Sequence, residues 1–339
     1  MPVPIHYRRN PWLLPEWSDD ERLVVNDPRA ERTFTVDSFL LRLLNRLSVP
    51  APARDLDHGG RSPDEFDALL QRLVDAGLLR AQATAGEGDG DDPLKDWSDG
   101  EIAMLARGAY AGRPDGPVET VPPQPLVHPE SRGTVKLPVD CRRASRPLAE
   151  VLSDRRSVRT YGPEPLTLAE LGTFLHRAAR VRAYTGPAEW QMTTRPSPAG
   201  GGLHSLELYL IARDVEGLEA GSYHYDPVAH VLERLTDWTG RLAAMQRELV
   251  CEPMRMTDPP QVSFYIASHH ARTRKYYGPM ALRLIHQNTG CLLQTLYLTA
   301  ADLGLAPCAT GLLEPEPGAE FLPEPKSAFV HTGNFALGR

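Results

Sequence analysis

The amino-acid sequence predicts an α+β protein with a small helical domain at its N-terminus and a larger body of helices and strands behind it. Two patterns predict this division. Residues 1–80 contain two apolar segments with helical spacing, whereas helix signals and short apolar strand signals alternate through residues 140–339. Between them, residues 81–139 begin with a glycine-rich acidic run and end in a segment dense in proline and glycine. That composition indicates a flexible linker, a short helix beginning at Ser98, and an extended arm.

The N-terminal domain carries a capping box, formed by Ser62 and Glu65, at the start of its clearest helix. Apolar residues follow at helical spacing, and Gly77 marks the end of the helix. A second amphipathic helix starts near Asp37, and residues 77–80 predict a short strand. Two or three short helices with a β wing are typical of a winged-helix module, so we expect a winged-helix-like domain.

Winged-helix domains often bind DNA, but the charge of this one argues against that function. Residues 33–80 contain six arginines, no lysine and seven acidic residues, so no basic stripe is available for a phosphate backbone. The whole chain has 37 Lys+Arg, 44 Asp+Glu and a formal net charge of −7, which argues against nucleic acid and anionic membranes as partners. We expect the domain either to recognise a peptide or only to stabilise the body.

Composition and cysteine content indicate a soluble cytoplasmic protein. The chain is 41% hydrophobic and 24% charged, as in ordinary globular proteins. Its cysteines are too few and too scattered for a disulfide framework or a zinc ribbon, at positions 141, 251, 291 and 308. The N-terminus has no apolar targeting segment. The longest uncharged stretch, residues 284–301, contains too many polar side chains for a membrane span, so we expect a buried helix there.

Two helices dominate the predicted body. A capping box of Thr167 and Glu170 opens the first, residues 167–182. The second, residues 280–303, spans about 36 Å at 1.5 Å per residue, so we expect it to cross the centre of the domain. A shorter helix signal and three strand signals complete the pattern, at residues 148–152, 206–212, 262–267 and 328–332.

Common active-site strings are missing from the sequence. There is no phosphate-binding P-loop string, no H-E-x-x-H and no G-x-S-x-G. The three glycines at 200–202 do not follow a strand in the spacing of a dinucleotide fingerprint. Adjacent His269 and His270 point in different directions on a strand or a helix, so they are poor joint metal ligands. We therefore expect no metal site.

Three segments of the body are suited to binding a ligand. Arg155–Arg159 has three arginines and a serine within five residues, which can surround a phosphate, although a solvated basic turn is the alternative. Arg195–Tyr209 runs from a proline-stiffened loop through three glycines into an apolar strand. Its backbone can lie against a flat ligand, or it is a plain glycine-rich turn. The backbone of Gly304–Leu312 could approach a ring closely, or this segment is an ordinary helix-to-strand connection.

Taken together and in this order, these segments resemble the FMN-dependent nitroreductase superfamily. Within it they are similar to the SagB-type azoline dehydrogenases, which act in ribosomal-peptide biosynthesis. The resemblance covers about residues 145–339 and rests on the strings RRSVR, RPSPAGGGLHSLELYL, GSYHYDPVAHVLERL and GCLLQTLYLTAADLGL. It implies a nitroreductase-type fold: a mixed sheet flanked by helices with a long central helix, assembled as an intertwined homodimer with FMN at the subunit interface.

The resemblance also implies the residues that bind FMN. The phosphate and ribityl chain would be held by the first segment, the isoalloxazine lined by the glycine-rich loop, and flavin N5 approached by the third segment. A basic residue near the C-terminus would also reach the phosphate. In this sequence these residues are Arg155, Arg156, Ser157 and Arg159; Pro198, Ala199 and Gly200; Thr310 and Gly311; and Arg339. Family members often have serine where this chain has Ala199, so a side-chain hydrogen bond is lost there.

Lys275 and Tyr276 carry the resemblance to the azoline dehydrogenases, which have a Lys-Tyr pair at the corresponding place. Aromatising an azoline removes one C–H as a proton and another as a hydride, which the flavin accepts. The protein must supply the base, and a lysine, or a tyrosine activated by it, is chemically suitable. The alternative is a surface lysine beside a core tyrosine. Which of the two residues is the base stays open.

The function implied is FMN-dependent oxidation of thiazoline or oxazoline rings to thiazole or oxazole in a peptide, alongside a cyclodehydratase partner. Three alternatives remain open. The chain could be an NAD(P)H-dependent nitro or quinone reductase, an oxidase acting on a carrier-bound substrate, or a non-catalytic flavoprotein scaffold for a cyclodehydratase. A scaffold would not require Lys275 and Tyr276, and a small-molecule reductase would not require a peptide-binding domain.

Overall fold

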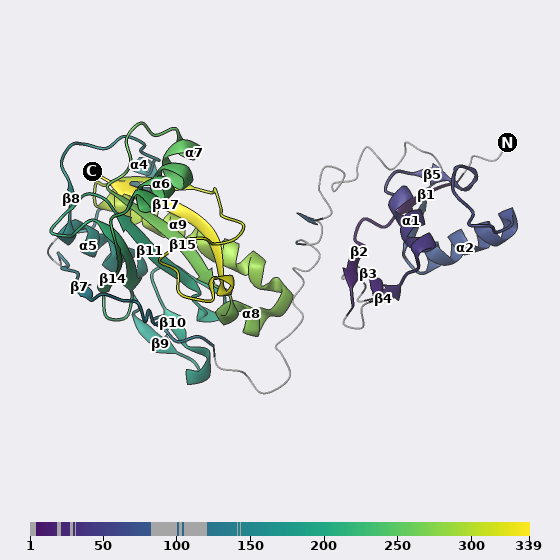
Figure 1. The fold of residues 1–339 in the computed structure, drawn as a ribbon, viewed down its shortest axis with the longest axis horizontal. Coiled ribbons are helices and arrows are strands. Elements are labelled where there is room, and N and C mark those ends of the chain that lie inside the picture. The colour runs from purple at the N-terminus through teal and green to yellow at the C-terminus, as the bar shows by residue number, and fades with distance from the viewer. Residues whose placement is uncertain are drawn as a thin grey trace. The chain divides into compact units, whose positions relative to one another are not determined.

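The computed structural model describes residues 5–18, 22–27, 30, 32–82, 100–101, 104, 121–140, 142 and 144–339. The chain separates into two compact units, residues 1–110 and 111–339. Both units are drawn in Figure 1. Most of the predicted linker, the start of the predicted helix at Ser98, and Cys141 lie outside the described residues.

The described part of the N-terminal unit up to residue 82 has two α-helices and two three-stranded sheets. The helices are α1 (Ser38–Arg46) and α2 (Pro63–Asp75). The capping box of Ser62 and Glu65 is confirmed, and Asp37 caps α1 by accepting a hydrogen bond from Leu40 N at 2.7 Å. The strands form the sheets β5–β1–β6 and β2–β3–β4, with β1 (His6–Arg9), β2 (Leu14–Trp17), β3 (Leu23–Asp27), β4 (Arg32–Thr35), β5 (Ala51–Pro52) and β6 (Leu79–Gln82).

The strand predicted at residues 77–80 is β6, which pairs antiparallel with β1 over its whole length. Strands β1 to β4 were not predicted from the sequence, because short strands with mixed polarity have no strong alternation to detect. The core of this unit lies under both helices and includes Phe66, Leu70 and Leu47, all fully buried. β6 lies at the edge of its sheet among the described residues.

The larger unit is built on a seven-stranded sheet. Its strand order is β16–β17–β15–β11–β13–β14–β7. The bounds are β7 (Thr134–Lys136), β11 (Leu206–Ala212), β13 (Gly221–Asp226), β14 (Val231–Asp237), β15 (Val262–His269), β16 (Ala306–Thr310) and β17 (Phe329–Gly338). Smaller pairs are β9 (Ala183–Thr185) with β10 (Met192–Thr194), and β8 (Leu166–Thr167) with β12 (Val215–Glu216).

The sheet expected to be mixed is antiparallel at every neighbouring pair of the seven strands. Parallel pairing among the described residues is confined to the two-residue pair β8–β12. The reason is the position of β17. The connection from β15 to β16 passes through two helices and would return β16 parallel to β15, but β17 inserts between them and is antiparallel to both.

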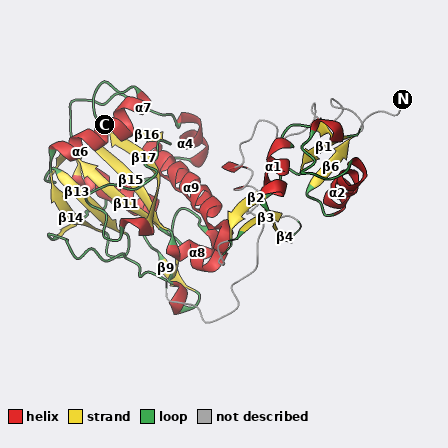
Figure 2. Cartoon of the chain, turned by 45° about the vertical axis from the view of Figure 1, so that its right-hand side comes forward, coloured by secondary structure: helices red, strands yellow, loops and turns green. Residues whose placement is uncertain are grey.

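Helices cover both faces of this sheet (Figure 2). One face carries α5 (Leu168–Ala179) and α9 (Ala281–Asp302), which pack on Leu206, Leu208 and Leu210 of β11. The other face carries α6 (Gly240–Gln246) and the segment around Phe321, which pack on Tyr209 and Ile211. The remaining helices are α4 (Leu148–Asp154), α7 (Glu252–Met254) and α8 (Ala271–Tyr277). β11 is therefore buried on both faces.

The main sequence-predicted elements of the body are confirmed. The capping box of Thr167 and Glu170 opens α5, and the predicted long helix is α9, with Met280 and Leu303 as its flanking residues. The strand predicted at 328–332 continues to residue 338, because burial in the middle of the sheet outweighs the turn signal of Gly333 and Asn334. Of the helices that the structure describes, α9 included, none combines the length and apolarity that crossing a membrane requires.

Candidate functional site

The three ligand-binding segments predicted from sequence all contact helix α9 or the strand beside it. The Tyr297 hydroxyl lies 2.8 Å from Ser157 Oγ and accepts a hydrogen bond from Ala309 N at 2.7 Å. Val158 N donates to Pro307 O at 2.7 Å. Tyr297 thus joins the Arg155–Arg159 segment to β16.

The Arg155–Arg159 segment presents positive charge with no carboxylate to balance it. The guanidinium of Arg155 lies over the Tyr297 ring, 5.3 Å from its centroid. Within the described part of the chain, none of the three arginines forms an ion pair. Arg156 and Val158 line a separate cavity of about 300 Å³, whereas Ser157 faces Tyr297. The uncompensated charge of Arg155 and Arg159 beside a hydroxyl fits an anion such as a phosphate.

Arg339 is engaged differently. Its guanidinium lies 3.5 Å from a carboxylate oxygen of Glu170 and 3.9 Å from one of Glu164. Its backbone oxygen accepts a hydrogen bond from Gly162 N at 2.6 Å. A phosphate would compete with these two carboxylates for this side chain, and the role of Arg339 in binding phosphate stays a prediction.

The glycine-rich loop is shaped by a close contact with α8. Gly200–Gly202 form one short turn, in which Gly201 has φ +58°. A Cβ atom on Gly201 would lie 2.8 Å from the hydroxyl oxygen of Tyr277. Both the positive φ and the close hydroxyl disfavour residues with a Cβ atom at this position. Tyr277, and not only the neighbouring Tyr276, therefore meets this loop.

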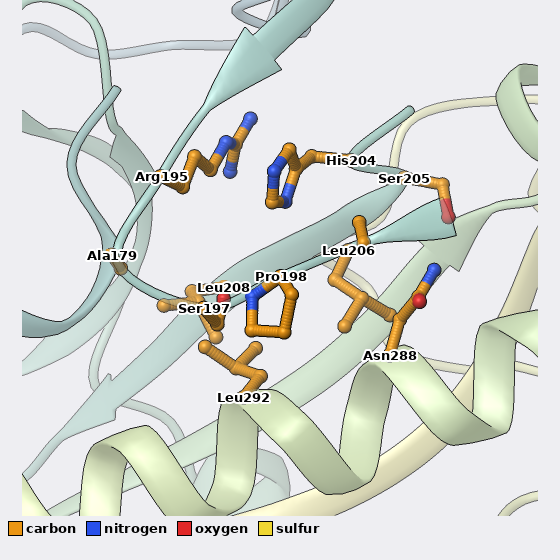
Figure 3. Close-up of a pocket in the computed structure, with 11 residues that line it drawn as sticks. Ala179, Arg195, Ser197, Pro198, His204, Ser205, Leu206, Leu208, Asn288 and Leu292 are labelled. Atoms are coloured by element: carbon orange, nitrogen blue, oxygen red, sulfur yellow. The ribbon is translucent and has the colours of Figure 1, made fainter. Parts of the chain in front are cut away.

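A small cavity lies beneath the loop, between Pro198, Asn288 and His204 (Figure 3). Its volume is about 20 Å³, which is room for about one water molecule. The cavity is therefore too small to hold a flavin ring. Burial lowers the pKa of His204 to about 3, so this ring is neutral.

Asn288 has an unsatisfied donor in this region. Its Oδ1 accepts a hydrogen bond from Gly200 N at 3.2 Å, but its buried Nδ2 has no partner among the described residues. Buried donors are rarely left unpaired. An orphaned amide beside a glycine loop fits a site that gains an acceptor when a ligand binds. Asn288 and Tyr277 were not predicted as site residues from the sequence, since neither stands out by local pattern.

Strand register brings the loop and α8 to one end of the sheet and directs the Thr310–Gly311 segment toward it. β11 begins and β15 ends at this end, where Leu206 pairs with Ser268, and α8 follows β15 directly. β16 runs toward the same end but stops short of it, since Thr310 pairs with Asn334, which in turn pairs with Tyr265 in the middle of β15. Figure 1 shows α8 at this end, together with β9 and β10, and α4 at the opposite end. The Arg155–Arg159 segment, which follows α4, lies beside the start of β16.

Lys275 and Tyr276 both lie on α8. Lys275 is half-buried and Tyr276 is buried, with its ring edge-on to Trp190 at 4.8 Å between centroids. Tyr276, Trp190 and Leu203 share one apolar cluster, so α8 packs on the residue that directly follows the three glycines. The roles of Lys275 and Tyr276 as candidate bases remain predictions.

Comparison with known proteins gives a family match and two informative relatives. The Nitroreductase family model matches residues 152–331. The protein "Putative nitroreductase MJ1384" of Methanocaldococcus jannaschii is 35% identical over 165 residues, which are 48% of this chain and 78% of that protein. The trifolitoxin-processing protein TfxB of Rhizobium leguminosarum bv. trifolii is 27% identical over 146 residues, 42% of this chain and 39% of TfxB.

Two solved structures are similar at lower levels. One is a chain of the E. coli microcin synthetase McbBCD complex with truncated pro-MccB17 bound, at 18% identity and a TM-score of 0.41, covering 73% of this chain and 96% of that one. The other is a nitroreductase in complex with FMN from Desulfovibrio desulfuricans, at 16% identity and a TM-score of 0.36, covering 57% and 87%. These scores are too low to transfer an activity.

The contact between Gly201 and Tyr277 makes a testable prediction about stability. Gly201→Ala should lower the free energy of unfolding by about 1–3 kcal/mol, because it adds a strained φ and a steric overlap. In a Tyr277→Phe background the same change should cost less, since the next atom of that ring is 3.7 Å away. Urea unfolding of the four proteins measures the difference. An equal cost in both backgrounds would contradict the contact.

Proposed function

Because this chain belongs to the nitroreductase family, we propose that it is an FMN-dependent dehydrogenase that oxidises thiazoline or oxazoline rings in a peptide to thiazole or oxazole. Its cofactor is FMN. The observation that carries the proposal is that α8, with Lys275 and Tyr276, is built onto the glycine loop through Tyr277 and Trp190. If that loop lines a flavin ring, α8 brings Tyr276 into the apolar cluster next to the loop, and Lys275 is its neighbour in sequence.

The residues present fit FMN. Arg155, Ser157 and Arg159 would hold the phosphate, because the charge of the two arginines is otherwise unbalanced and Ser157 offers a hydroxyl. Asn288 Nδ2 is a free donor at the glycine loop. A Cβ atom placed on Gly311 would meet no described residue within 4 Å, so a planar group can approach that backbone. From Pro307, where the phosphate segment contacts β16, the strand continues for about 10 Å to Thr310 at 3.3 Å per residue. This order follows that of phosphate, ribityl chain and ring in FMN.

We further propose that a second copy of the chain completes the site. Asn288 contacts the glycine loop and Tyr297 contacts the phosphate segment, and these residues are nine positions apart on α9. At about 100° per residue they lie on opposite sides of the helix. One chain therefore presents the two ligand-binding segments in different directions. A homodimer would bring the phosphate segment of one protomer together with the glycine loop of its partner.

The reaction needs a base and a positioned ring. When bound, FMN supplies the acceptor for the hydride removed from the azoline. Lys275 Nζ or the Tyr276 hydroxyl would take the proton from the neighbouring ring carbon. The apolar cluster of Trp190, Leu203 and Tyr276 would exclude water beside these groups and hold α8 in place. The similarity to TfxB, whose name records the processing of trifolitoxin, supports a peptide substrate.

A nitro or quinone reductase is the second candidate. It is favoured by the match to MJ1384, which reaches 78% of that protein. Such an enzyme needs the flavin site but no base on α8, so variants of Lys275 and Tyr276 separate the two functions.

The phosphate assignment predicts a loss of flavin. Arg159→Ala should weaken FMN binding about 10–100-fold, because a hydrogen bond to a charged group is worth about 1.5–3 kcal/mol. Flavin absorbance of the purified variant and an FMN fluorescence titration measure it. Arg241→Ala is the matched control, since that exposed guanidinium donates a hydrogen bond to Gly318 O, away from the phosphate segment. Unchanged affinity in the Arg159 variant would overturn the assignment.

The base assignment predicts a loss of turnover without a loss of flavin. Lys275→Ala and Tyr276→Phe should lower azoline oxidation about 10²–10⁴-fold while both proteins stay yellow. Tyr277→Phe serves as the comparison on the same helix. Wild-type rates from both base variants on an azoline peptide would refute the roles. Nitroaromatic reduction that neither change affects, with no azoline activity in any protein, would support the reductase.

The N-terminal domain gives a third prediction. We propose that it binds an extended segment of the substrate peptide, which could add a strand at the edge formed by β6. Fluorescence anisotropy with labelled precursor peptide should give micromolar binding to the full chain, and labelled duplex DNA should give none. If neither ligand binds, and removing residues 1–80 lowers Tm but leaves peptide turnover intact, the domain is structural.

A further inference from the structure

A second cluster of functional side chains lies on the face of the sheet away from α9. It consists of His128 from the arm before β7, His224 on β13 and Glu233 on β14. Tyr209, His224 and Glu233 are register partners on three adjacent strands, so their side chains share one face. The proposed FMN site uses none of these residues.

We propose that His128, His224 and Glu233 bind a divalent transition-metal ion, with Zn²⁺ as the best match to two imidazoles and one carboxylate. The Nδ1 atoms of both rings face the same carboxylate oxygen. Glu233 Oε2 lies 3.1 Å from His128 Nδ1 and 2.8 Å from His224 Nδ1. Ligands bound tetrahedrally to Zn²⁺ at about 2.0–2.2 Å lie about 3.3–3.5 Å apart. All three candidate ligand atoms lie within 4.8 Å of one another, so small shifts of these side chains would admit the ion.

The second nitrogen of each ring is already held, as it is in protein zinc sites. His224 Nε2 lies 2.9 Å from a carboxylate oxygen of Glu207, and His128 Nε2 lies 3.0 Å from the Tyr209 hydroxyl. Glu207 is itself fixed by a buried ion pair with Arg272. Such outer partners orient an imidazole and select the tautomer that leaves Nδ1 free for a metal.

A cavity gives the cluster access to solvent. Its volume is about 470 Å³, and its lining includes His128, Arg132, Glu320 and Phe321. The two imidazoles are buried, whereas one fifth of the Glu233 side chain is exposed. A water molecule, or a donor atom of a bound molecule, can take the fourth position from this side. The ion would tie the arm to β13 and β14.

Without an ion the same groups form a hydrogen-bond network. Burial would lower the pKa of His224, but hydrogen bonds to Glu207 and Glu233 raise it above its ordinary value. Its imidazolium then donates to both carboxylates, and His128 donates its Nδ1–H to Glu233. A bound metal ion would take the place of the two Nδ1 protons. The metal-free hydrogen-bond network is therefore the alternative that an experiment must exclude.

Untagged full-length protein, stripped with a chelator, should bind one Zn²⁺ per chain in isothermal titration. Co²⁺ should give the visible bands of a four- or five-coordinate ion. Glu233→Gln preserves the shape of the network but removes the anionic ligand. Removing an outer partner of a metal ligand typically weakens metal binding about 10–100-fold, and we expect Tyr209→Phe to fall in that range. Glu233→Gln and His128→Ala remove ligands themselves, so they should weaken Zn²⁺ binding more than that.

His270→Ala is the matched control, because that ring contacts Ser327 O away from the cluster. It should leave Zn²⁺ affinity unchanged. Circular dichroism checks that each variant folds. If His128→Ala does not fold, Glu233→Gln still tests the proposal. Absence of stoichiometric binding, or binding that Glu233→Gln leaves intact, would overturn the proposal in favour of the hydrogen-bond network. Flavin absorbance should stay constant throughout, so the outcome is independent of the proposed FMN site.

Discussion

The buried guanidinium of Arg272 is the contact on which the arrangement of the larger unit depends. It is 1% exposed and forms an ion pair with Glu207 on β11. It also donates hydrogen bonds to the backbone oxygens of Pro122 and Pro123 in the arm, and to that of His204 in the glycine loop. One side chain on α8 therefore fixes the arm, the loop and the central strand at the same time.

This contact links the two sites through Glu207. Burial would raise the pKa of Glu207, but Arg272 and His224 outweigh it and hold that pKa below its ordinary value, so the carboxylate stays charged. Through Arg272 the Glu207 carboxylate anchors α8, which carries Lys275 and Tyr276, and through its other oxygen it orients His224. Removing one partner of such a pair leaves an uncompensated buried charge. The glycine loop and the histidine cluster are thus held by a common network.

Local signals in the sequence predicted α1, α2, α4, α5 and α9, but they did not predict α6, α7 or α8, and they could not show contacts between distant segments. The capping boxes at Ser62 and Thr167 are readable because donor and acceptor are three residues apart. Asn288, by contrast, acquires its role from a hydrogen bond to Gly200, 88 positions away. His128 and His224 likewise meet only because the arm returns to the sheet. The glycine loop was predictable because positive φ restricts residue type, whereas the pairing of β1 with β6 follows from tertiary packing alone.

The place of β17 in the sheet has a consequence for how the larger unit folds. β17 comes last in sequence among the described strands, yet it lies between β15 and β16, pairing with β15 through residues 329–337 and with β16 through residues 334–338. Until it docks, the edge of β15 is unpaired and β16 has no neighbour. The sheet therefore closes by long-range pairing late in folding, a topology that slows folding and leaves hydrophobic strand edges open in the intermediate. During synthesis these edges would be exposed to chaperones, and to pairing with other nascent chains, until the last strand has been made.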